Sequence, residues 1–502
     1  MSEKIHRGKI KTPPDPLVVK YLIAPGIQND IKYRFQSFLD CNKAHVLMLC
    51  EQKIITREVA KAILVCNQDM AKMGDYPQFE VDPGREDFYF NLEAHLIESV
   101  GIEIGGQQHT ARSRNDLYAT CARLAVRKKF FEISHLFNEM RQAILNVAKE
   151  NTEAVFAEYT HMQPSEPITF GHYCSAILNA LERDYARFEH CFLGLNLSPL
   201  GGGSMGSTTW PINRERTAHL LGFDAPIDNS IDCVASRDFV TDILSSLSIA
   251  ANTLSRFCQD LYVWATPDYG YIEVSDSCAV CSSIMPQKKN PWVLEHIKAK
   301  AAHVEGCFVS AINVMKNVIY SHCEDMCGEA ANYLYPGMDE MKVMCELMKV
   351  SIEGISVRKE QMLKKAEQNF SAVTELANAL VRHDGISFRM AHDIVAEVVA
   401  YMLAHQKGAN EIGCEVVNPI YNKLFGKETT MSDQQIHAAL DPVAIAYSKS
   451  ITGGTAPDEV NRQLSARQKK LDEDNARLLA REQSVNKAKS ELEESVAKLI
   501  KS

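Results

Sequence analysis

The segment CSSIMPQKKNPWVLEHIKAKAAHV, residues 281–304, joins a polar, cationic loop to a long run of helical periodicity. Asn290 followed by Pro291 predicts a helix start, with the asparagine as N-cap and the proline at the first helical position. Free backbone N–H groups at a helix N-terminus can hold a carboxylate, and Lys288 and Lys289 add to the positive field. Taken alone, such a loop is more often only a solvated basic turn.

Other stretches show the same helical periodicity over greater lengths. From Leu117 onward, apolar residues recur at the spacing of one helix face. These are Leu117, Cys121, Leu124, Ile133, Leu136, Met140, Ile144 and Val147. Similar patterns cover 169–192, 230–265 and 292–318, with few strand signals between them. Long helices without intervening strands predict an all-α bundle.

A chain of 502 residues is too long for one ordinary core, so two or three domains are expected. We predict an N-terminal helical domain over 1–105, a central long-helix bundle domain over 106–360 and a C-terminal helical domain over 361–457. A polar helical tail over 458–502 follows the Gly-rich stop TGGTAP.

The tail has only one of the two apolar rows that form the seam of a coiled coil. Leucine or valine recurs at seven-residue intervals, at Leu464, Leu471, Leu478, Val485, Leu492 and Leu499. The partner core positions are mostly polar, and they are Gln468, Asn475, Glu482, Lys489 and Val496. A seam with only one apolar row is weak, so we expect a solvated or loosely docked helix.

Composition excludes several classes of protein. A formal net charge of -10 argues against a nucleic-acid partner, and no apolar run reaches the roughly 18 residues that a membrane span requires. The 15 cysteines are scattered and odd in number, and the opening MSEKIHRGKIKTPPDP contains no apolar signal region. We therefore expect a cytoplasmic protein with reduced thiols.

Two more loops carry groups suited to carboxylate chemistry. HTARSRNDL, residues 109–117, precedes the long helix and contains Arg114, whose guanidinium can grip a carboxylate with two hydrogen bonds. EYTHMQPSEP, residues 158–167, places Thr160 and His161 before another helical run. A lone histidine is more often structural than catalytic, although the polar turn around this one favours a chemical role.

Together these loops resemble a known family. The three signature regions of the fumarase/aspartase superfamily are similar to THMQP, SSIMPQKKNP and HTARSRND. The residues in these stretches are most similar to those of argininosuccinate lyase. AHVLMLCEQKIIT, PLGGGSMGSTTWPINRE, IDCVASRDFV and GGTAP extend the resemblance. It covers residues 40–460 and leaves the leucine-spaced tail unexplained.

The resemblance implies a mainly α, three-domain fold with a long central helical bundle, assembled as a homotetramer. Each active site in this family is completed by three subunits. The family reaction removes a proton next to a carboxylate and an amine from the adjacent carbon, which releases fumarate. It uses neither a metal nor an organic cofactor.

The resemblance also assigns roles by motif position. Ser282 falls on the family's catalytic serine and would act as the base, and His161 would protonate the leaving amine. Glu295 matches the carboxylate that raises the basicity of the histidine. Lys288 and Asn290 would stabilise the dianionic aci-carboxylate.

The succinyl carboxylates would be held by groups from all three loops. Ser113, Arg114 and Asn115 come from the first loop and Thr160 from the second. Ser283, beside the catalytic serine, completes the set.

The amine half of the substrate is less clear from the motifs. Argininosuccinate lyases follow the catalytic loop with a YNRDLQEDKE-like stretch, whose Tyr, Gln and Lys hold the amino-acid end of arginine. Here the stretch is NVIYSHCEDMCGE, residues 317–329. Aligning the acidic pairs places Val318, Cys323 and Met326 at those positions, and aligning Tyr320 instead loses the Gln and the Lys. Losing several charge-assisted hydrogen bonds, each worth roughly 1.5–3 kcal/mol, predicts a different amine.

The sequence therefore predicts a carbon–nitrogen lyase that eliminates fumarate from an N-substituted aspartate, an N-succinyl amine or aminopolycarboxylate. The leading specific prediction is an activity like that of ethylenediamine-N,N'-disuccinate lyase. Argininosuccinate lyase itself is the nearest alternative. Some relatives serve as lens crystallins, so a structural role is a further alternative, which the retained Ser282, His161, Lys288, Asn290 and Glu295 argue against.

Overall fold

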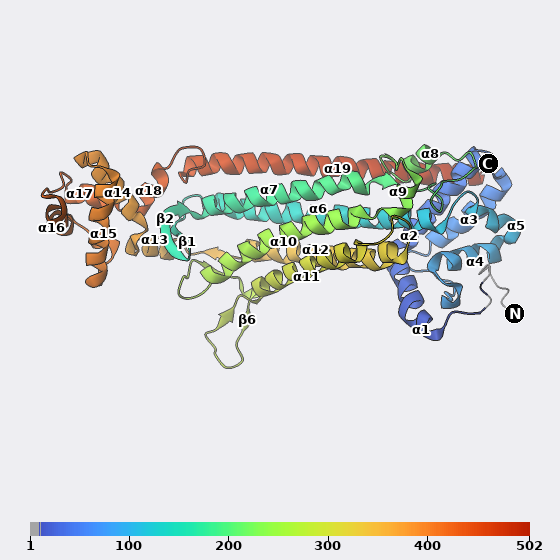
Figure 1. Ribbon diagram of the computed structural model, residues 1–502, viewed down its shortest axis with the longest axis horizontal. Helices are drawn as coiled ribbons and strands as arrows, with labels where there is room; N and C mark the ends of the chain where they lie inside the picture. The colour runs from blue at the N-terminus through green and yellow to red at the C-terminus, as the bar shows by residue number, and fades with distance from the viewer. Residues whose placement is uncertain (1–9, 11, 502) are drawn as a thin grey trace.

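The computed structural model describes Ile10 and residues 12–501. Helices form three groups along a long molecule, with the N-terminal helices at one end, a bundle in the middle and a small helical lobe at the other end (Figure 1). The predicted mainly α fold is confirmed. Residues 1–9 and 11, which form most of the opening segment in which we predict no apolar signal, lie outside the described residues.

The bundle consists of long helices packed around one apolar core. They are α6 (Arg114–Glu150), α7 (Phe170–Leu195), α10 (Asp238–Trp264), α11 (Trp292–Met315) and α12 (Leu334–Glu353). The periodic residues of α6 face inward as predicted, since Leu117, Met140 and Ile144 are each fully buried. Among the described residues, no helix combines the length and the apolar character needed to cross a membrane.

One predicted helix is two helices. The stretch over 230–265 breaks into α9 (Ser230–Ala235) and α10, because Ser236 between them has extended backbone with ψ 136°. The Arg237 guanidinium donates to the carbonyls of Val234 and Ser236, at 3.3 and 2.7 Å. These bonds satisfy carbonyl groups at the end of α9.

The N-terminal group has its own apolar core. It contains α1 (Pro16–Val18), a π-helix at Val19–Ile23, α2 (Ala24–Glu51), α3 (Arg57–Ala71), α4 (Phe88–Val100), α5 (Ile102–Gly105) and α8 (Arg214–Leu220), with 3-10 turns at Pro83–Arg85 and Gly106–His109.

The C-terminal lobe surrounds a third core. It is built from α13 (Lys359–Gln368), α14 (Val373–Asp384), α15 (Phe388–Ala404), α16 (Cys414–Phe425), α17 (Asp433–Ala439) and α18 (Pro442–Ser448), with 3-10 turns at Phe370–Ala372 and Ala409–Glu411. Further turns precede α12 and the catalytic loop, at Asp325–Ala330 (π), Ala331–Tyr333 and Asp276–Cys278.

Strands occur only as two-stranded pairs in the described part of the chain. The pairs are β1 (Val155–Thr160) with β2 (Gln163–Thr169), β3 (Leu197–Ser198) with β4 (Ala225–Pro226), β5 (Ile272–Glu273) with β8 (Ser356–Val357), and β6 (Val280–Cys281) with β7 (Lys289–Asn290).

The tail departs from its prediction. It forms α19 (Pro457–Lys501), which runs along the bundle from the C-terminal lobe to the N-terminal group (Figure 1). Leu464 and Leu478 are buried in the bundle core, and Leu492 and Val496 are buried in the N-terminal core. The prediction of a solvated or loosely docked helix is therefore wrong.

Polar groups on α6 explain why the seam is stable despite its polar row. Gln468 exchanges hydrogen bonds with Gln142 (2.9 and 3.2 Å), Asn475 accepts one from Asn138 (2.9 Å), and Glu482 lies 2.8 Å from His135 Nε2. At the centre, Arg141 and Asp474 form an ion pair of 2.9 Å with both side chains at most 2% exposed. The polar positions of the tail are therefore satisfied by partners on α6 that are distant in the sequence.

Candidate functional site

The first two signature loops lie at opposite ends of the long helix α6. HTARSRNDL ends in the first turn of α6, whereas Thr160 and His161 follow the far end of this helix. A helix of 37 residues is about 55 Å long. A single chain therefore does not bring the predicted site residues together, and Ser113, Arg114 and Asn115 are separated from Thr160 and His161.

The first loop is held rigidly by capping. The Ser113 hydroxyl and the Asp116 carboxylate form a capping box at the start of α6. Asp116 also accepts the N–H groups of Gly201 (2.8 Å) and Gly203 (3.1 Å), so it joins this loop to GGGSMG. Burial raises the pKa of Asp116 to about 6, even though three backbone donors favour its ionised form.

Arg114 and Asn115 face a cleft of about 490 Å³ at the N-terminal end of the bundle. Arg114 is already paired with Asp87 at 2.6 Å, and the Asn115 amide donates to the carbonyl of Ser204 at 3.2 Å. A substrate carboxylate at this position would share Arg114 with Asp87.

The cleft is also lined by residues that the motifs did not identify. His322 and Cys327 line it, and the Cys327 Sγ lies 3.2 Å from His322 Nδ1. Arg237, only 2% exposed, donates to the same sulfur at 3.3 Å. Desolvation together with Arg237 and Arg114 lowers the pKa of His322 to about 4, and desolvation raises the pKa of Cys327. Both groups are therefore neutral at pH 7.

The residues that the two predicted alignments assign to the arginine end do not line the cleft, although Glu324, Gly328 and Glu329 of the same segment do. Val318, Cys323 and Met326 are absent from its lining. The Tyr320 hydroxyl instead donates to Asp232 at 2.5 Å. The segment forms an irregular π-helical turn at Asp325–Ala330, whose register cannot be read from a motif.

The second loop is the tip of the β1–β2 hairpin. Thr160 pairs with Gln163, so His161 and Met162 form a two-residue turn with φ of 54° and 59°. Two consecutive positive φ angles are typical of a type I′ turn, which normally contains Asn or Gly. Thr160 and His161 are exposed. A histidine held in this conformation at a loop tip supports a functional role.

A buried carboxyl lies at the bulge of the same hairpin. Glu158 sits where the β1–β2 register shifts, and its Oε2 has no hydrogen-bond partner among the described residues. Burial, and secondarily the nearby Asp260 carboxylate, raises the pKa of Glu158 to about 7.

Replacing Glu158 with glutamine should change the pH dependence of stability. The pKa in the folded state lies above that of an unfolded glutamate, so the stabilisation from the protonated group is complete below about pH 4.5 and disappears as the pH rises through 7. Glu158→Gln should be more stable than the parent by roughly 1–2 kcal/mol at pH 8 and equal to it at pH 4.5. Denaturant unfolding at both pH values measures this, and an equal difference at the two pH values would contradict it.

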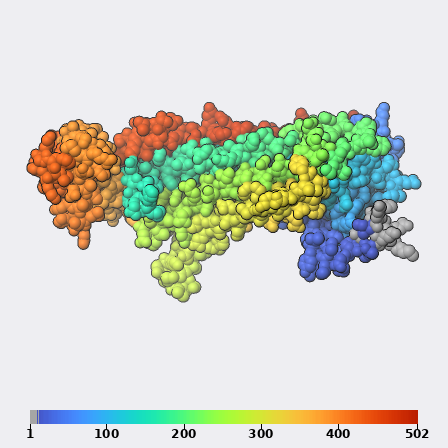
Figure 2. All heavy atoms as spheres, in the orientation of Figure 1, coloured from blue at the N-terminus to red at the C-terminus, as the bar shows by residue number. Residues whose placement is uncertain are grey.

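The third loop is the β6–β7 hairpin, which projects from the side of the bundle (Figures 1 and 2). Ser282 Oγ accepts the N–H groups of Ile284 (3.3 Å) and Met285 (3.1 Å), which shapes the turn. Ser283 and Lys288 are exposed on it. Ser282 and Asn290, which belong to the same hairpin, are half-buried.

The predicted cap at the end of this loop is wrong. Asn290 belongs to β7, where it pairs with Val280, and α11 begins at Trp292 with Pro291 at its N-cap position. The strand pairing therefore determines the backbone of Asn290. Glu295, in the first turn of α11, accepts a hydrogen bond from the Tyr262 hydroxyl at 3.1 Å.

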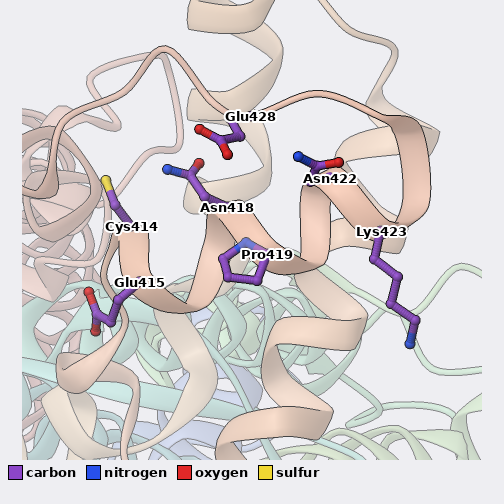
Figure 3. A pocket seen from close by; sticks show the side chains of 7 residues that line it. All are labelled: Cys414, Glu415, Asn418, Pro419, Asn422, Lys423 and Glu428. Carbon is purple, nitrogen blue, oxygen red and sulfur yellow. The ribbon is translucent and has the colours of Figure 1, made fainter.

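Another depression, of about 670 Å³, lies on α16 in the C-terminal lobe. Figure 3 shows Glu415, Asn418 and Glu428 around it, with Lys423 directed away. It is open and contains none of the signature residues, so the site chemistry does not involve it.

The chain is similar to proteins of known name over nearly its whole length. A family model described as lyase matches residues 28–306, and a model of the argininosuccinate lyase C-terminal region matches 370–446. Argininosuccinate lyase 1 of Shouchella clausii is 42% identical over 96% of both chains. Argininosuccinate lyase of Methanocaldococcus jannaschii is 35% identical over 97% of this chain and 98% of its own.

Solved structures show the same architecture. EDDS lyase in complex with formate superposes with a TM-score of 0.87 and 29% identity, covering 98% of this chain and 97% of its own. Fumarate lyase from Mesorhizobium sp. BNC1, 19% identical with a TM-score of 0.69 over 87% of this chain and 97% of its own, shares the fold.

Proposed function

Because the chain belongs to the argininosuccinate lyase branch of the fumarase/aspartase superfamily, as a carbon–nitrogen lyase, we propose that it releases fumarate from an N-substituted aspartate other than argininosuccinate. The proposed substrate is an N-succinyl amine of the aminopolycarboxylate class. The observation that carries this proposal is an intact SSIMPQKKNP hairpin combined with an altered wall of the cleft.

The altered wall supports a different amine. His322 and Cys327, both neutral, line the same cleft as Arg114. A zwitterionic arginine end needs charged partners for its carboxylate and for its ammonium; His322 and Cys327 supply neither, and Glu324 and Glu329 of the same segment, which also line the cleft, could pair only with the ammonium. The similarity to EDDS lyase supports an aminopolycarboxylate, whereas the names of the curated relatives favour argininosuccinate as the second candidate.

The proposed chemistry assigns one role to each signature residue. Ser282 removes the proton next to the carboxylate, and its deprotonation depends on the positive field around Lys288. Asn290 and Lys288 hold the aci-carboxylate as its charge develops. His161, paired with Glu295 of another subunit, protonates the leaving amine.

Binding is assigned to the remaining signature residues. Ser113, Arg114 and Asn115 hold one end of the succinyl group, and Thr160 and Ser283 hold the other. The residues of this chain provide both the charge and the proton transfer, and no metal or organic cofactor enters the proposal.

A homotetramer explains how distant loops can form one site. The separation of about 55 Å along α6 requires other subunits to supply the missing loops. Large apolar side chains are exposed on α10, α11 and α12, at Ile249 (44%), Val309 (54%), Ile312 (44%) and Val350 (47%). An apolar face of this kind on a bundle suits contact with further copies. All 15 cysteines are free, which supports a reducing compartment such as the cytoplasm.

The test is fumarate release by the purified protein from a panel of N-substituted aspartates. The proposal expects turnover of an aminopolycarboxylate and little or none of argininosuccinate. Efficient turnover of argininosuccinate would support the second candidate instead.

A further inference from the structure

The two lysines of the β6–β7 hairpin have different surroundings. Lys289 Nζ lies 3.2 Å from Glu273 Oε1 and 2.6 Å from Asp276 Oδ1. Lys288 is exposed and has no ion-pair partner among residues 12–501. Lys288 is thus free to meet a substrate, whereas Lys289 is held at the base of the hairpin.

Glu273 extends this tether to the C-terminal lobe. Its second oxygen, Oε2, accepts a hydrogen bond from Arg358. Arg358 directly precedes α13, and its backbone N–H donates to the carbonyl of Tyr271 at 2.9 Å. Glu273 also pairs through its backbone with Ser356 in the β5–β8 ladder. One carboxylate therefore joins the hairpin to the start of the lobe.

The same lobe contacts the hairpin that carries His161. Helix α13 packs against β1, and α18 packs against β2. Lys449, immediately after α18, forms an ion pair of 2.5 Å with Glu166 on β2. Both catalytic hairpins of one subunit are therefore attached to the C-terminal lobe.

The β6–β7 ladder is too short to orient the hairpin by itself. It contains two residue pairs, Val280 with Asn290 and Cys281 with Lys289. A hairpin of this size is at best marginally stable in isolation. Its direction must therefore depend on contacts at its base, and the Glu273 carboxylate makes one of these, with Lys289, while also binding Arg358.

We propose that Glu273 is a positioning residue, which fixes the catalytic hairpin by binding Lys289 on one oxygen and Arg358 on the other. The inference rests on the proposed function for its effect on rate. Each exposed ion pair contributes little to stability, but a displacement of a catalytic group by about 1 Å can lower a rate by as much as about 10²-fold. The effect should therefore appear in kcat more than in stability.

Glu273→Gln tests this inference by two readouts. Steady-state kinetics should show kcat lowered about 10-fold with KM changed less than about 2-fold, because binding groups on the other loops are intact. Hydrogen exchange of the peptide 280–291 should be faster than in the parent, because Lys289 loses its link through Glu273 to Arg358 and keeps only its ion pair with Asp276. Lys289→Arg should retain both properties, since it keeps the ion pair.

Two controls make the result specific. Glu305→Gln removes an exposed carboxylate of α11 that has no ion-pair partner in the described part of the chain, and it should change neither readout. The effects of Lys289→Met and Glu273→Gln should be less than additive when the two are combined, because both changes break the Glu273–Lys289 contact. Unchanged hydrogen exchange in Glu273→Gln would overturn the inference. Absence of fumarate release by the parent would overturn the proposed function instead, and hydrogen exchange would still decide this inference.

Discussion

Ser282→Ala should lower fumarate release by at least about 10³-fold while fumarate binding remains close to that of the parent. Alanine removes the base that takes the proton but leaves Lys288, Asn290 and the carboxylate-binding groups in place. Stopped-flow or steady-state fumarate production measures the loss, and titration with fumarate measures the binding. A variant that retains more than about one tenth of the parent rate would contradict the assignment of Ser282.

A control is needed because the Ser282 hydroxyl also accepts two backbone N–H groups of the turn. Ser277→Ala, an exposed serine just before the same hairpin, should retain full activity. Mixed tetramers separate the roles further. Refolding Ser282→Ala together with His161→Asn should restore part of the activity, because some sites then receive an intact loop from each subunit. No recovery in verified mixed tetramers would exclude a site shared between chains.

Removal of residues 458–502 should prevent folding. The deletion takes away seven large buried side chains, Val460, Leu464, Leu471, Leu478, Leu492, Val496 and Leu499. Burial of each contributes roughly 1.5–3 kcal/mol, so the loss approaches or exceeds the total stability of about 5–15 kcal/mol of an ordinary protein. It also leaves Arg141 buried without its partner Asp474. A soluble, helical and active truncated protein would contradict this expectation.

Two adjacent leucines of α19 give a matched pair of single substitutions. They test the docking of α19 without requiring the protein to unfold completely. Leu478 is 1% exposed, and Leu479 is 49% exposed. Leu478→Ala should destabilise the protein by about 2–5 kcal/mol, and Leu479→Ala by less than about 0.5 kcal/mol. Equal effects in denaturant unfolding would show that α19 is not docked through its leucine row.

The long helices were predictable because their periodicity is a local signal. The apolar positions of α6 face the core as predicted. The helices α7 and α11 begin within two residues of their predicted starts. The docking of α19 was not predictable, because Gln468 and Asn475 are satisfied by Gln142 and Asn138, more than 300 residues away. A polar heptad position gives no indication of whether a distant partner exists.

The site was predictable only where its residues belong to motifs. Motifs identified Ser282, His161 and Arg114, but the wall containing His322 and Cys327 lies in an irregular turn with no motif. The cap predicted at Asn290 failed because a strand pairing outweighed the local Asn-Pro signal. The separation of the first two loops follows from the length of α6, which the helical periodicity from Leu117 onward indicates.

The most direct test of the central claim is the initial rate of fumarate formation, followed by ultraviolet absorbance, with argininosuccinate and ethylenediamine-N,N'-disuccinate offered separately to the purified protein. We predict release from the aminopolycarboxylate at an ordinary enzymatic rate, on the order of 1–10³ per second, and at most a small fraction of that rate from argininosuccinate. The reverse order of rates would contradict the account, because it would mean that the segment containing His322 and Cys327 accepts the arginine end.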